Sequence, residues 1–362
     1  MKSQHLSALV AGVLVMMAAV PVPVQAQQEW SFEGNELLVT NLVGEVTVRG
    51  HDGSRIIVRA QPGGDDADAI SFEVKEGGRA EFHAVYPLDQ TTEIHYPRRR
   101  GGSSQFRLES WTDESSFLED LYSGISGRER IRIGGDVGRG ALEAWTDLEI
   151  LVPRGVDTRV AIVVGEIKAM NVEAGVDLDT HSGKVTAENI GGNTRIDTGS
   201  GSVDVTGVLG DLWVDTGSGS VEAALIEGDD IRIDTGSGSV TIDGGSASSL
   251  EVDTGSGSVR TRDISCDRAM IDTGSGSVTL DLVRMGTGNY VIDTGSGGVT
   301  VNLPADASVH VIAETGSGGI NLDVPNAMLR RMSRDEIELE IGGGDARLQI
   351  DTGSGGITLR TR

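Results

Sequence analysis

Apolar and polar residues alternate in short runs through the second half of the chain, two runs to each period of about 19 residues. In the stretch 230–243, Ile231 and Ile233 alternate with polar residues, and Val240 and Ile242 do the same after a polar turn. Alternation with a period of two is typical of strands that bury one face. Each period therefore predicts two short strands joined at a turn, with their apolar side chains pointing to a common core.

The turns share one phrase, Asp-Thr-Gly-Ser-Gly-Ser/Gly-Val/Ile. Its full copies begin at Asp197, Asp215, Asp234, Asp253, Asp272, Asp293 and Asp351, and variants begin at Asp179 and Glu314. Neighbouring copies are 18, 19 or 21 residues apart, except for a last step of 37. A fixed period with one turn signal per period indicates a stacked repeat. The sequence thus predicts an all-β fold, a single-chain β-solenoid of about 19 residues per coil, and leaves its handedness open.

The second glycine of each phrase is the residue we expect the turn to require. These glycines are Gly201, Gly219, Gly238, Gly257, Gly276, Gly297, Gly318 and Gly355. A glycine recurs at such a corner because the backbone needs a positive φ or because another backbone comes close. The threonine and serine columns are expected to form hydrogen bonds along the stack.

The repeated aspartates raise the question of a metal column. Stacked carboxylates repel by about 1 kcal/mol per adjacent pair in water. We expect each aspartate to accept hydrogen bonds from the N–H groups of its own turn. The alternative is calcium bound between coils, although the nine-residue spacing of calcium-binding β-helical repeats is missing. That alternative column would be Asp197, Asp215, Asp234, Asp253, Asp272 and Asp293; no other metal or cofactor is expected.

Four regions are expected along the chain. Residues 1–26 have the basic start, apolar run and small-residue cleavage site of a signal peptide. Residues 27–96 are a β-rich N-terminal region or cap, and 97–141 are a polar insertion or mobile loop that holds one short helix at 113–121. Residues 142–362 are the solenoid array. Within it, 325–333 is expected to be a loop or short helix, with one repeat hidden between Glu314 and Asp351.

Charge and cysteine content narrow the environment. The chain carries a formal net charge of −25 and a single cysteine, Cys266, so it forms no internal disulfide. An acidic surface disfavours nucleic acid and anionic membranes as partners. No stretch after the signal peptide is long and apolar enough for a membrane helix. We expect an exported protein of the periplasm or cell surface, of unknown oligomeric state.

The chemistry-bearing residues favour a protein without catalytic activity. Asp-Thr-Gly-Ser also occurs in aspartic peptidases, but those enzymes need two carboxylates in one cleft and have one copy per lobe. Residues 147–362 contain one tryptophan, Trp213, and one tyrosine, Tyr290, and no histidine lies near Cys266 in sequence. Neither a Ser-His-Asp set nor a phosphate-binding loop is found. No catalytic residue is predicted, and a hydrolase or lyase acting on envelope polymers is the alternative.

The array resembles the bacterial YvlB-like family of β-strand repeat proteins, described as candidate adhesins of unknown function. The resemblance rests on residues 41–50 (Asn-Leu-Val-Gly-Glu-Val-Thr-Val-Arg-Gly), on the Leu-Val-Pro-Arg-Gly entry at 151–155, and on the recurring Ser-Gly-x-Val/Ile corners. It implies an adhesin-like binding or structural protein of the cell envelope with a protein or glycan ligand. It implies no catalytic residues.

Overall fold

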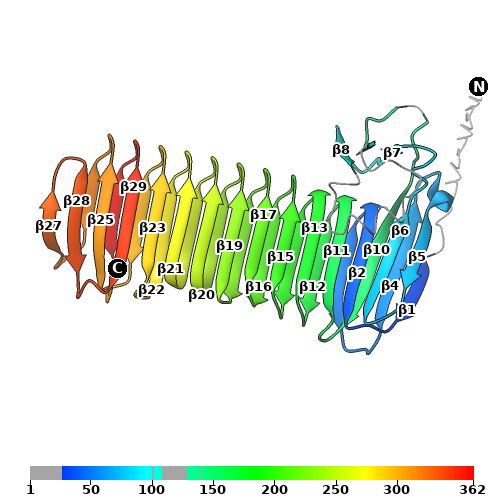
Figure 1. Ribbon diagram of the computed structural model, residues 1–362, viewed down its shortest axis with the longest axis horizontal. Helices are drawn as coiled ribbons and strands as arrows, with labels where there is room; N and C mark the ends of the chain where they lie inside the picture. The colour runs from blue at the N-terminus through cyan, green and yellow to red at the C-terminus, as the bar shows by residue number, and fades with distance from the viewer. Residues whose placement is uncertain (1–26, 100–101, 108–128, 139) are drawn as a thin grey trace, which may run out of the picture.

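The computed structural model describes residues 27–99, 102–107, 129–138 and 140–362. In these residues the chain consists of strands and the turns that join them, and the one helical element is a three-residue 3-10 helix, Ala67–Ala69. The strands stack side by side into a long rod (Figure 1), so the predicted β-solenoid is confirmed. No helix in this described part is long and apolar enough to cross a membrane. The expected signal peptide and the helix at 113–121 lie outside the described residues.

Each central repeat contributes one strand to each of two parallel sheets. The first sheet holds the strands that precede the turn phrase: β13 (Val176–Ser182), β15 (Thr194–Thr198), β17 (Leu212–Thr216) and β19 (Asp230–Thr235). The second holds the strands that follow it: β14 (Val185–Ile190), β16 (Val203–Leu209) and β18 (Val221–Glu227). Two 15-residue strands run from the second sheet into the first: β20 (Val240–Thr254) and β21 (Val259–Thr273).

The apolar columns expected inside the rod form its core. The residue before each aspartate is at most 3% exposed in Ile196, Val214, Ile233, Val252, Ile271 and Ile292. The residue two after the second glycine is at most 1% exposed in Val203, Val221, Val240, Val259, Val278 and Val299. Burying one such side chain contributes roughly 1.5–3 kcal/mol. Stacking is what completes this burial, because one coil alone leaves both of its flanks open.

The first coil of the stack comes from the N-terminal region. β2 (Glu36–Val43) pairs in parallel with β11 (Asp157–Val164), and β3 (Val46–His51) pairs in parallel with β12 (Ile167–Val172). Gly44 therefore lies one coil before Gly165, and the boundary expected at residue 142 cuts through a continuous stack. Antiparallel pairings close this end of the rod with β1 (Gln28–Phe32), β4 (Ile56–Gly63), β5 (Ser71–Lys75), β6 (Arg79–Val85) and β10 (Trp145–Pro153).

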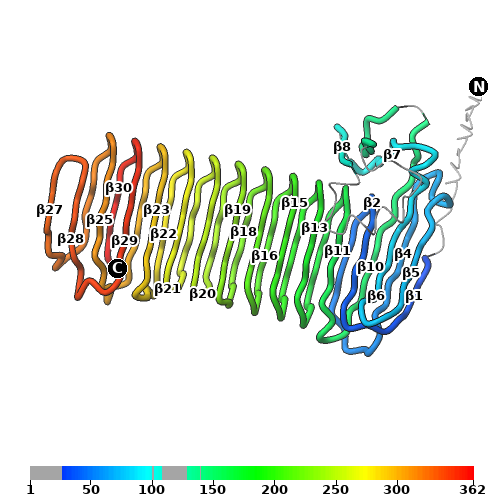
Figure 2. The backbone as a smooth tube through the Cα atoms, in the orientation of Figure 1, coloured from blue at the N-terminus to red at the C-terminus, as the bar shows by residue number. Residues whose placement is uncertain are grey.

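The described part of the 97–141 insertion contributes to a second, small sheet beside the N-terminal end of the rod (Figure 2). The sheet consists of β7 (Glu93–His95), β8 (Ser103–Arg107) and β9 (Arg130–Gly134). The insertion contacts the turn of the first copy of the repeated phrase. Arg99 Nη1, in the segment between β7 and β8, donates to Ser182 Oγ at 3.1 Å, and the ring of Phe106 in β8 lies 6.5 Å from that of His181. These residues form strands and contacts where a loop was expected.

The last coil in sequence is not the last coil in space. Its first strand, β29, pairs in parallel with β23 on one side and β25 on the other, and β30 lies in the same way between β24 and β26. The strands concerned are β22 (Val278–Met285), β23 (Asn289–Thr294), β24 (Val299–Leu303), β25 (Val309–Thr315), β26 (Ile320–Asp323), β29 (Ala346–Thr352) and β30 (Ile357–Thr361). The coil of Asp351 is thus inserted between those of Asp293 and Glu314 (Figure 2).

An antiparallel hairpin caps the C-terminal end. β27 (Met328–Met332) pairs with β28 (Glu336–Ile341), which itself pairs antiparallel with β25. The expectation of a loop or helix at 325–333 is wrong, and so is the expected hidden repeat, since the hairpin fills the 37-residue step. All five residues of β27 are exposed. Because this strand buries neither face, its sequence lacks the alternation of apolar and polar residues that would have predicted a strand.

Candidate functional site

The turn edge of the rod is held together by its buried threonines. Thr235 Oγ1 accepts a hydrogen bond from the backbone N–H of Gly238, with an N···O distance of 3.0 Å. It also donates a hydrogen bond to the carbonyl oxygen of Gly219 in the preceding coil, at 3.1 Å. The same two bonds recur in the coils of Thr254, Thr273, Thr294, Thr315 and Thr352. Each threonine is nearly fully buried. Threonine, and not the expected aspartate, therefore caps the turn N–H, and it also ties each coil to the one before.

Thr235→Val is expected to lower the free energy of unfolding by about 1–3 kcal/mol, because it leaves the buried Gly238 N–H and Gly219 carbonyl without their partner. The two side chains have nearly the same shape, so packing changes little. The measurement is the urea midpoint followed by circular dichroism. Thr241→Val is the control, since that half-buried hydroxyl makes no hydrogen bond to a described residue; a loss of equal size there would contradict the assignment.

The second turn glycines leave no room for a side chain. A Cβ at Gly238 would lie 1.8 Å from the Gly219 carbonyl oxygen. The corresponding distance is 1.6–2.0 Å at every predicted turn position: Gly201, Gly219, Gly257, Gly276, Gly297, Gly318 and Gly355. Positive φ angles occur in this column only at its start, in Gly44 and Gly165. The close approach of one coil's backbone to the next is thus the reason for glycine here, and the site is structural.

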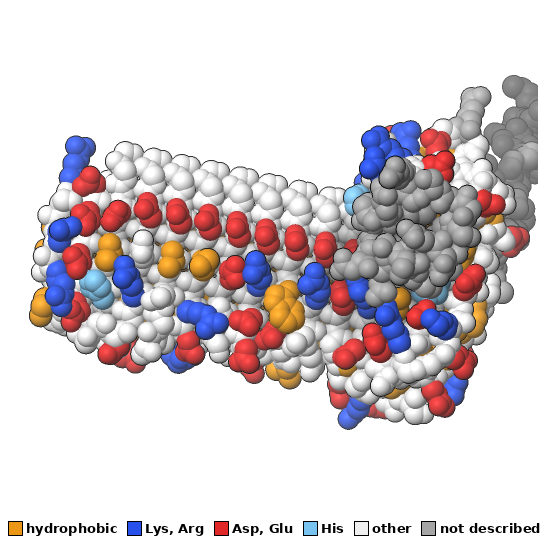
Figure 3. All heavy atoms as spheres, in the orientation of Figure 1, with side chains coloured by type: hydrophobic (Ala, Val, Ile, Leu, Met, Phe, Trp, Pro, Cys, Tyr) orange, Lys and Arg blue, Asp and Glu red, His pale blue; other side chains and the backbone are white. Residues whose placement is uncertain are grey.

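The repeated aspartates form one exposed row. Backbone pairing places Asp179, Asp197, Asp215, Asp234, Asp253, Asp272 and Asp293 next to one another in successive coils, followed by Asp351 and Glu314. Figure 3 shows this row as an unbroken acidic line beside the ridge of turns. Burial, and then the carboxylates of Asp215 and Asp253, raise the pKa of Asp234. Burial and the neighbouring Asp293 and Asp253 raise the pKa of Asp272 in the same way.

Replacing Asp234 and Asp272 by Asn is expected to raise the melting temperature at pH 7. A raised pKa means that the folded state binds protons more readily than the unfolded one, so stability falls as pH rises from the ordinary value of 3.8 through the folded value. Removing the charges relieves that loss at neutral pH, and the advantage disappears at pH 3, where the wild-type groups are protonated. The measurement is the difference in melting temperature between variant and wild type at pH 7 and at pH 3. The same difference at both pH values would rule out charge repulsion as the cause.

The row offers poor coordination for calcium. Calcium takes six to eight oxygen ligands around it, whereas carboxylates in a straight row reach a cation from only two sides. Within the described residues, no group of three or more His, Cys, Asp or Glu side chains is arranged to hold a metal ion. We therefore expect the same melting temperature in calcium and in chelator; chelator-sensitive melting would support the calcium alternative.

A second outward row, two residues before the aspartates, differs in almost every coil. Its members in successive coils are Asp177, Arg195, Trp213, Arg232, Glu251, Met270, Val291, Gln349 and Ile312. Figure 3 shows mixed side-chain types along the rod below the acidic line. The rod thus combines a constant interior and turn edge with an exposed face that changes from coil to coil.

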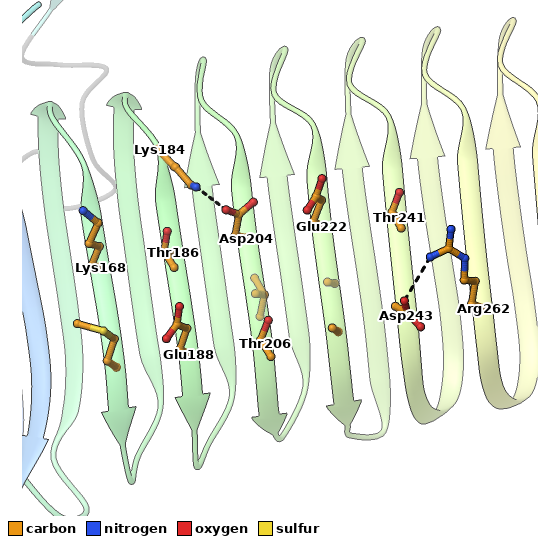
Figure 4. Close-up of a pocket in the computed structure, with 14 residues that line it drawn as sticks. Lys168, Lys184, Thr186, Glu188, Asp204, Thr206, Glu222, Thr241, Asp243 and Arg262 are labelled. Atoms are coloured by element: carbon orange, nitrogen blue, oxygen red, sulfur yellow. Dashed lines mark hydrogen bonds and ion pairs between the residues drawn. The ribbon is translucent and has the colours of Figure 1, made fainter.

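The second sheet carries an open groove of about 720 Å³ (Figure 4). Most of the charges labelled there are paired: Lys184 Nζ lies 2.5 Å from Asp204, and Arg262 lies 3.3 Å from Asp243. The hydrogen bond to Asp204 raises the pKa of Lys184. Glu222 and several threonines lie between these two ion pairs. The groove is a polar surface on which most charges are already satisfied.

The first sheet carries a smaller hollow of about 590 Å³ that includes the variable row. Half-buried Trp213 and exposed Arg195 line it together with Asp177, Asn193 and Asp157. The sequence showed only that tryptophan is rare in the array. The register adds that Trp213 lies directly between Arg195 and Arg232 in the sheet.

Cys266 and His181, two further residues with reactive side chains, lie where they support the structure. Cys266 is fully buried, and burial raises the pKa of its thiol to about 12; a reactive thiol needs a lowered pKa and access to solvent. His181 replaces the first turn glycine of its copy, and burial, followed by the nearby Arg99, lowers its pKa. Neither residue lies in the hollow or the groove.

Of the three comparisons with known proteins, the one with a family model matches the repeat. The chain spans 93% of its own length and 99% of the other when superposed on a candidate cell adhesion protein from Clostridium sporogenes ATCC 15579, at 13% identity and a TM-score of 0.23, which is too low to relate the two folds. No curated protein matches. The Toastrack family of unknown function, DUF4097, matches residues 146–360. These residues include every copy of the turn phrase, and the chain belongs to the DUF4097 (Toastrack) family.

Proposed function

We propose that this protein is a non-catalytic rod that presents a binding face in the cell envelope, in the manner of an adhesin. One observation carries the proposal: the buried columns and the turn edge repeat almost unchanged, while the outward-facing row from Asp177 to Ile312, whose members are exposed or half-buried, changes in nearly every coil. Repeat proteins bind their partners in this way, with variable exposed positions on a constant scaffold.

The construction of the rod suits such a role. Its two sheets hydrogen-bond every central coil to both neighbours, and the threonine bonds add a second tie at the turn edge. The exposed side chains are therefore held at fixed spacings of about 4.8 Å along the rod. A preorganised row loses little conformational freedom when an extended ligand binds along it.

Export belongs to the same proposal. The apolar run and small-residue cleavage site within residues 1–26 support a signal peptide, which would place the mature chain in the periplasm or at the cell surface. The ligand would then be a component of the envelope or of a surface that the cell meets.

The test compares the exposed row with the turn edge. Immobilised protein of residues 27–362 is exposed to an envelope fraction, and retained material is measured. One variant changes the exposed row to serine at Arg195, Trp213, Arg232 and Glu251. Its matched control changes exposed turn serines to alanine at Ser200, Ser218, Ser237 and Ser256.

We expect the row variant to retain at most a tenth of the wild-type amount and the turn control to retain all of it. Equal retention by both variants, with both folded, would contradict the proposal. Release of fragments from an envelope polymer by the wild-type protein would point instead to an enzyme.

A further inference from the structure

The hollow on the first sheet combines an aromatic ring with an unpaired cation. The sheet register places Trp213 between Arg195 and Arg232. Arg232 is paired with Glu251 at 3.3 Å, and Arg159, which also lines the hollow, is paired with Asp177 at 3.5 Å. The exposed Arg195 guanidinium makes no ion pair or hydrogen bond to any residue that the structure describes. On a chain with a net charge of −25, an unpaired cation beside an indole needs an explanation.

The polar groups around this pair retain free hydrogen-bonding capacity. Asn193 Oδ1 accepts the N–H of Asp211 at 3.0 Å, which leaves the two amide protons of Asn193 free to donate. Asp157 Oδ1 accepts the N–H of Gly175 at 2.8 Å, which leaves its second oxygen free to accept. Both side chains line the hollow. Donors and acceptors fixed by the backbone in this way suit the hydroxyl groups of a ligand.

Each group matches one part of an acidic sugar. The face of an indole packs against the C–H face of a sugar ring, as aromatic side chains do in interfaces that are partly wet. A guanidinium binds a carboxylate through two parallel hydrogen bonds. Adjacent strands are about 4.8 Å apart, close to the length of one pyranose unit, so Trp213 and Arg195 can contact neighbouring parts of one chain.

We propose that this hollow binds a carboxylate-bearing oligosaccharide, with Trp213 stacking on a sugar ring and Arg195 binding a carboxylate. The inference rests on the proposed binding function and deepens it by naming the class of ligand. Glu36 and Asp177 also line the hollow, but each is paired with an arginine. Arg195 is the lining cation without an ionic partner among the described residues, and this favours an acidic over a neutral glycan. The hydroxyl-matching groups of Asn193 and Asp157 favour a saccharide over an acidic peptide.

The experiment uses residues 27–362 and four probes: an oligogalacturonate, an oligomannuronate, neutral maltohexaose and an oligoglutamate. Calorimetry measures affinity, and tryptophan fluorescence reports contact with the ring. We expect binding of at least one acidic oligosaccharide, weakened by added salt, and binding of maltohexaose and oligoglutamate that is at least tenfold weaker.

Variants locate the site. Trp213→Ala and Arg195→Glu are each expected to weaken binding at least tenfold, and Arg195→Lys to weaken it less, because lysine keeps the charge but loses the two-bond geometry. Met270→Ala changes an exposed residue of the same row three coils away and should bind like the wild type. Melting temperatures equal to that of the wild type establish that the variants are folded. If Trp213→Ala melts at a lower temperature, the affinity of Arg195→Glu is the result that tests the site.

Four outcomes would each overturn the inference. Three concern the wild-type protein: that it binds neither acidic oligosaccharide, binds maltohexaose as tightly as the acidic oligosaccharides, or binds oligoglutamate more tightly than them. The fourth outcome is an Arg195→Glu variant that keeps the wild-type affinity. The envelope-retention assay on the wild-type protein separates failure of this inference from failure of the proposed function. If the wild type retains envelope material but binds neither acidic oligosaccharide, only the proposed ligand class is wrong. If the wild type retains no envelope material either, the proposed binding function is also wrong.

Discussion

Gly238→Ala is expected to destabilise the protein by at least about 3 kcal/mol, toward the upper end of the range for overpacking. The new Cβ would lie 1.8 Å from the carbonyl oxygen of Gly219 and 2.4 Å from its carbon. Neither atom can move aside, because the coil of Gly219 is hydrogen-bonded to both of its neighbours, through Thr235 on one side and through Thr216 to Gly201 on the other. The two coils must separate locally, which also breaks the Thr235 bonds. A fall of roughly 4 °C or more in melting temperature is the expected readout for a chain of this length.

Two other glycines of the turns make a graded series. A Cβ at Gly236 would lie 2.5 Å from the Gly217 carbonyl oxygen, and one at Gly319 meets nothing within 4 Å. We expect the loss of stability to decrease from Gly238→Ala to Gly236→Ala, and Gly319→Ala to be close to neutral. A Gly238→Ala protein that melts with the wild type would mean that the coils are farther apart than the structure places them.

Ending the chain after Asp345 is expected to unfold far more than the residues removed. The deleted strands β29 and β30 lie between the coils of Asp293 and Glu314. Without them β25 and β26 lose their parallel neighbours, and the apolar flank of β23 and β24 is opened to water. Hydrogen exchange should show that 309–341 loses protection, while the rod up to β24 keeps it.

A chain that ends after Leu303 is the matched control, because it removes the same coil together with the hairpin and the coil of Glu314. Both truncated proteins should have protected strands that end at β24. In a stack that followed sequence order, β25 would still rest on β23 after truncation at Asp345. Continued protection of 309–315 in that protein would therefore contradict the inserted coil.

The repeated unit was predictable because its signals are local. Alternation around Ile231 and Val240 identifies two strands with inward side chains, and the glycine between them marks the corner. The same alternation also contains the answer that the sequence interpretation missed. Ile233 points inward, so Asp234 must point outward and Thr235 inward, which leaves the threonine hydroxyl, and not the carboxylate, to cap the turn.

The hollow could be predicted only in part. Trp213 and Arg195 are 18 residues apart in sequence, and nothing local marks them as a pair. One coil length separates them, so the stack makes them neighbours in the sheet. Whether Arg195 is paired depends on side chains of other coils, such as the Asp177 that bonds Arg159 instead.

The sequence by itself determined the strands, the core columns, the turn and the coil length, because each depends on side chains within a few residues of one another. Only the tertiary structure decided the order of the coils: residues 36–51 as the first rung, 346–361 inserted before the coil of Glu314, and an exposed hairpin as the cap. The physical reason lies in the repetition. Nearly identical rungs offer one another nearly identical backbone and apolar partners, so local pattern cannot distinguish neighbours, and the caps and the chain connections select among them.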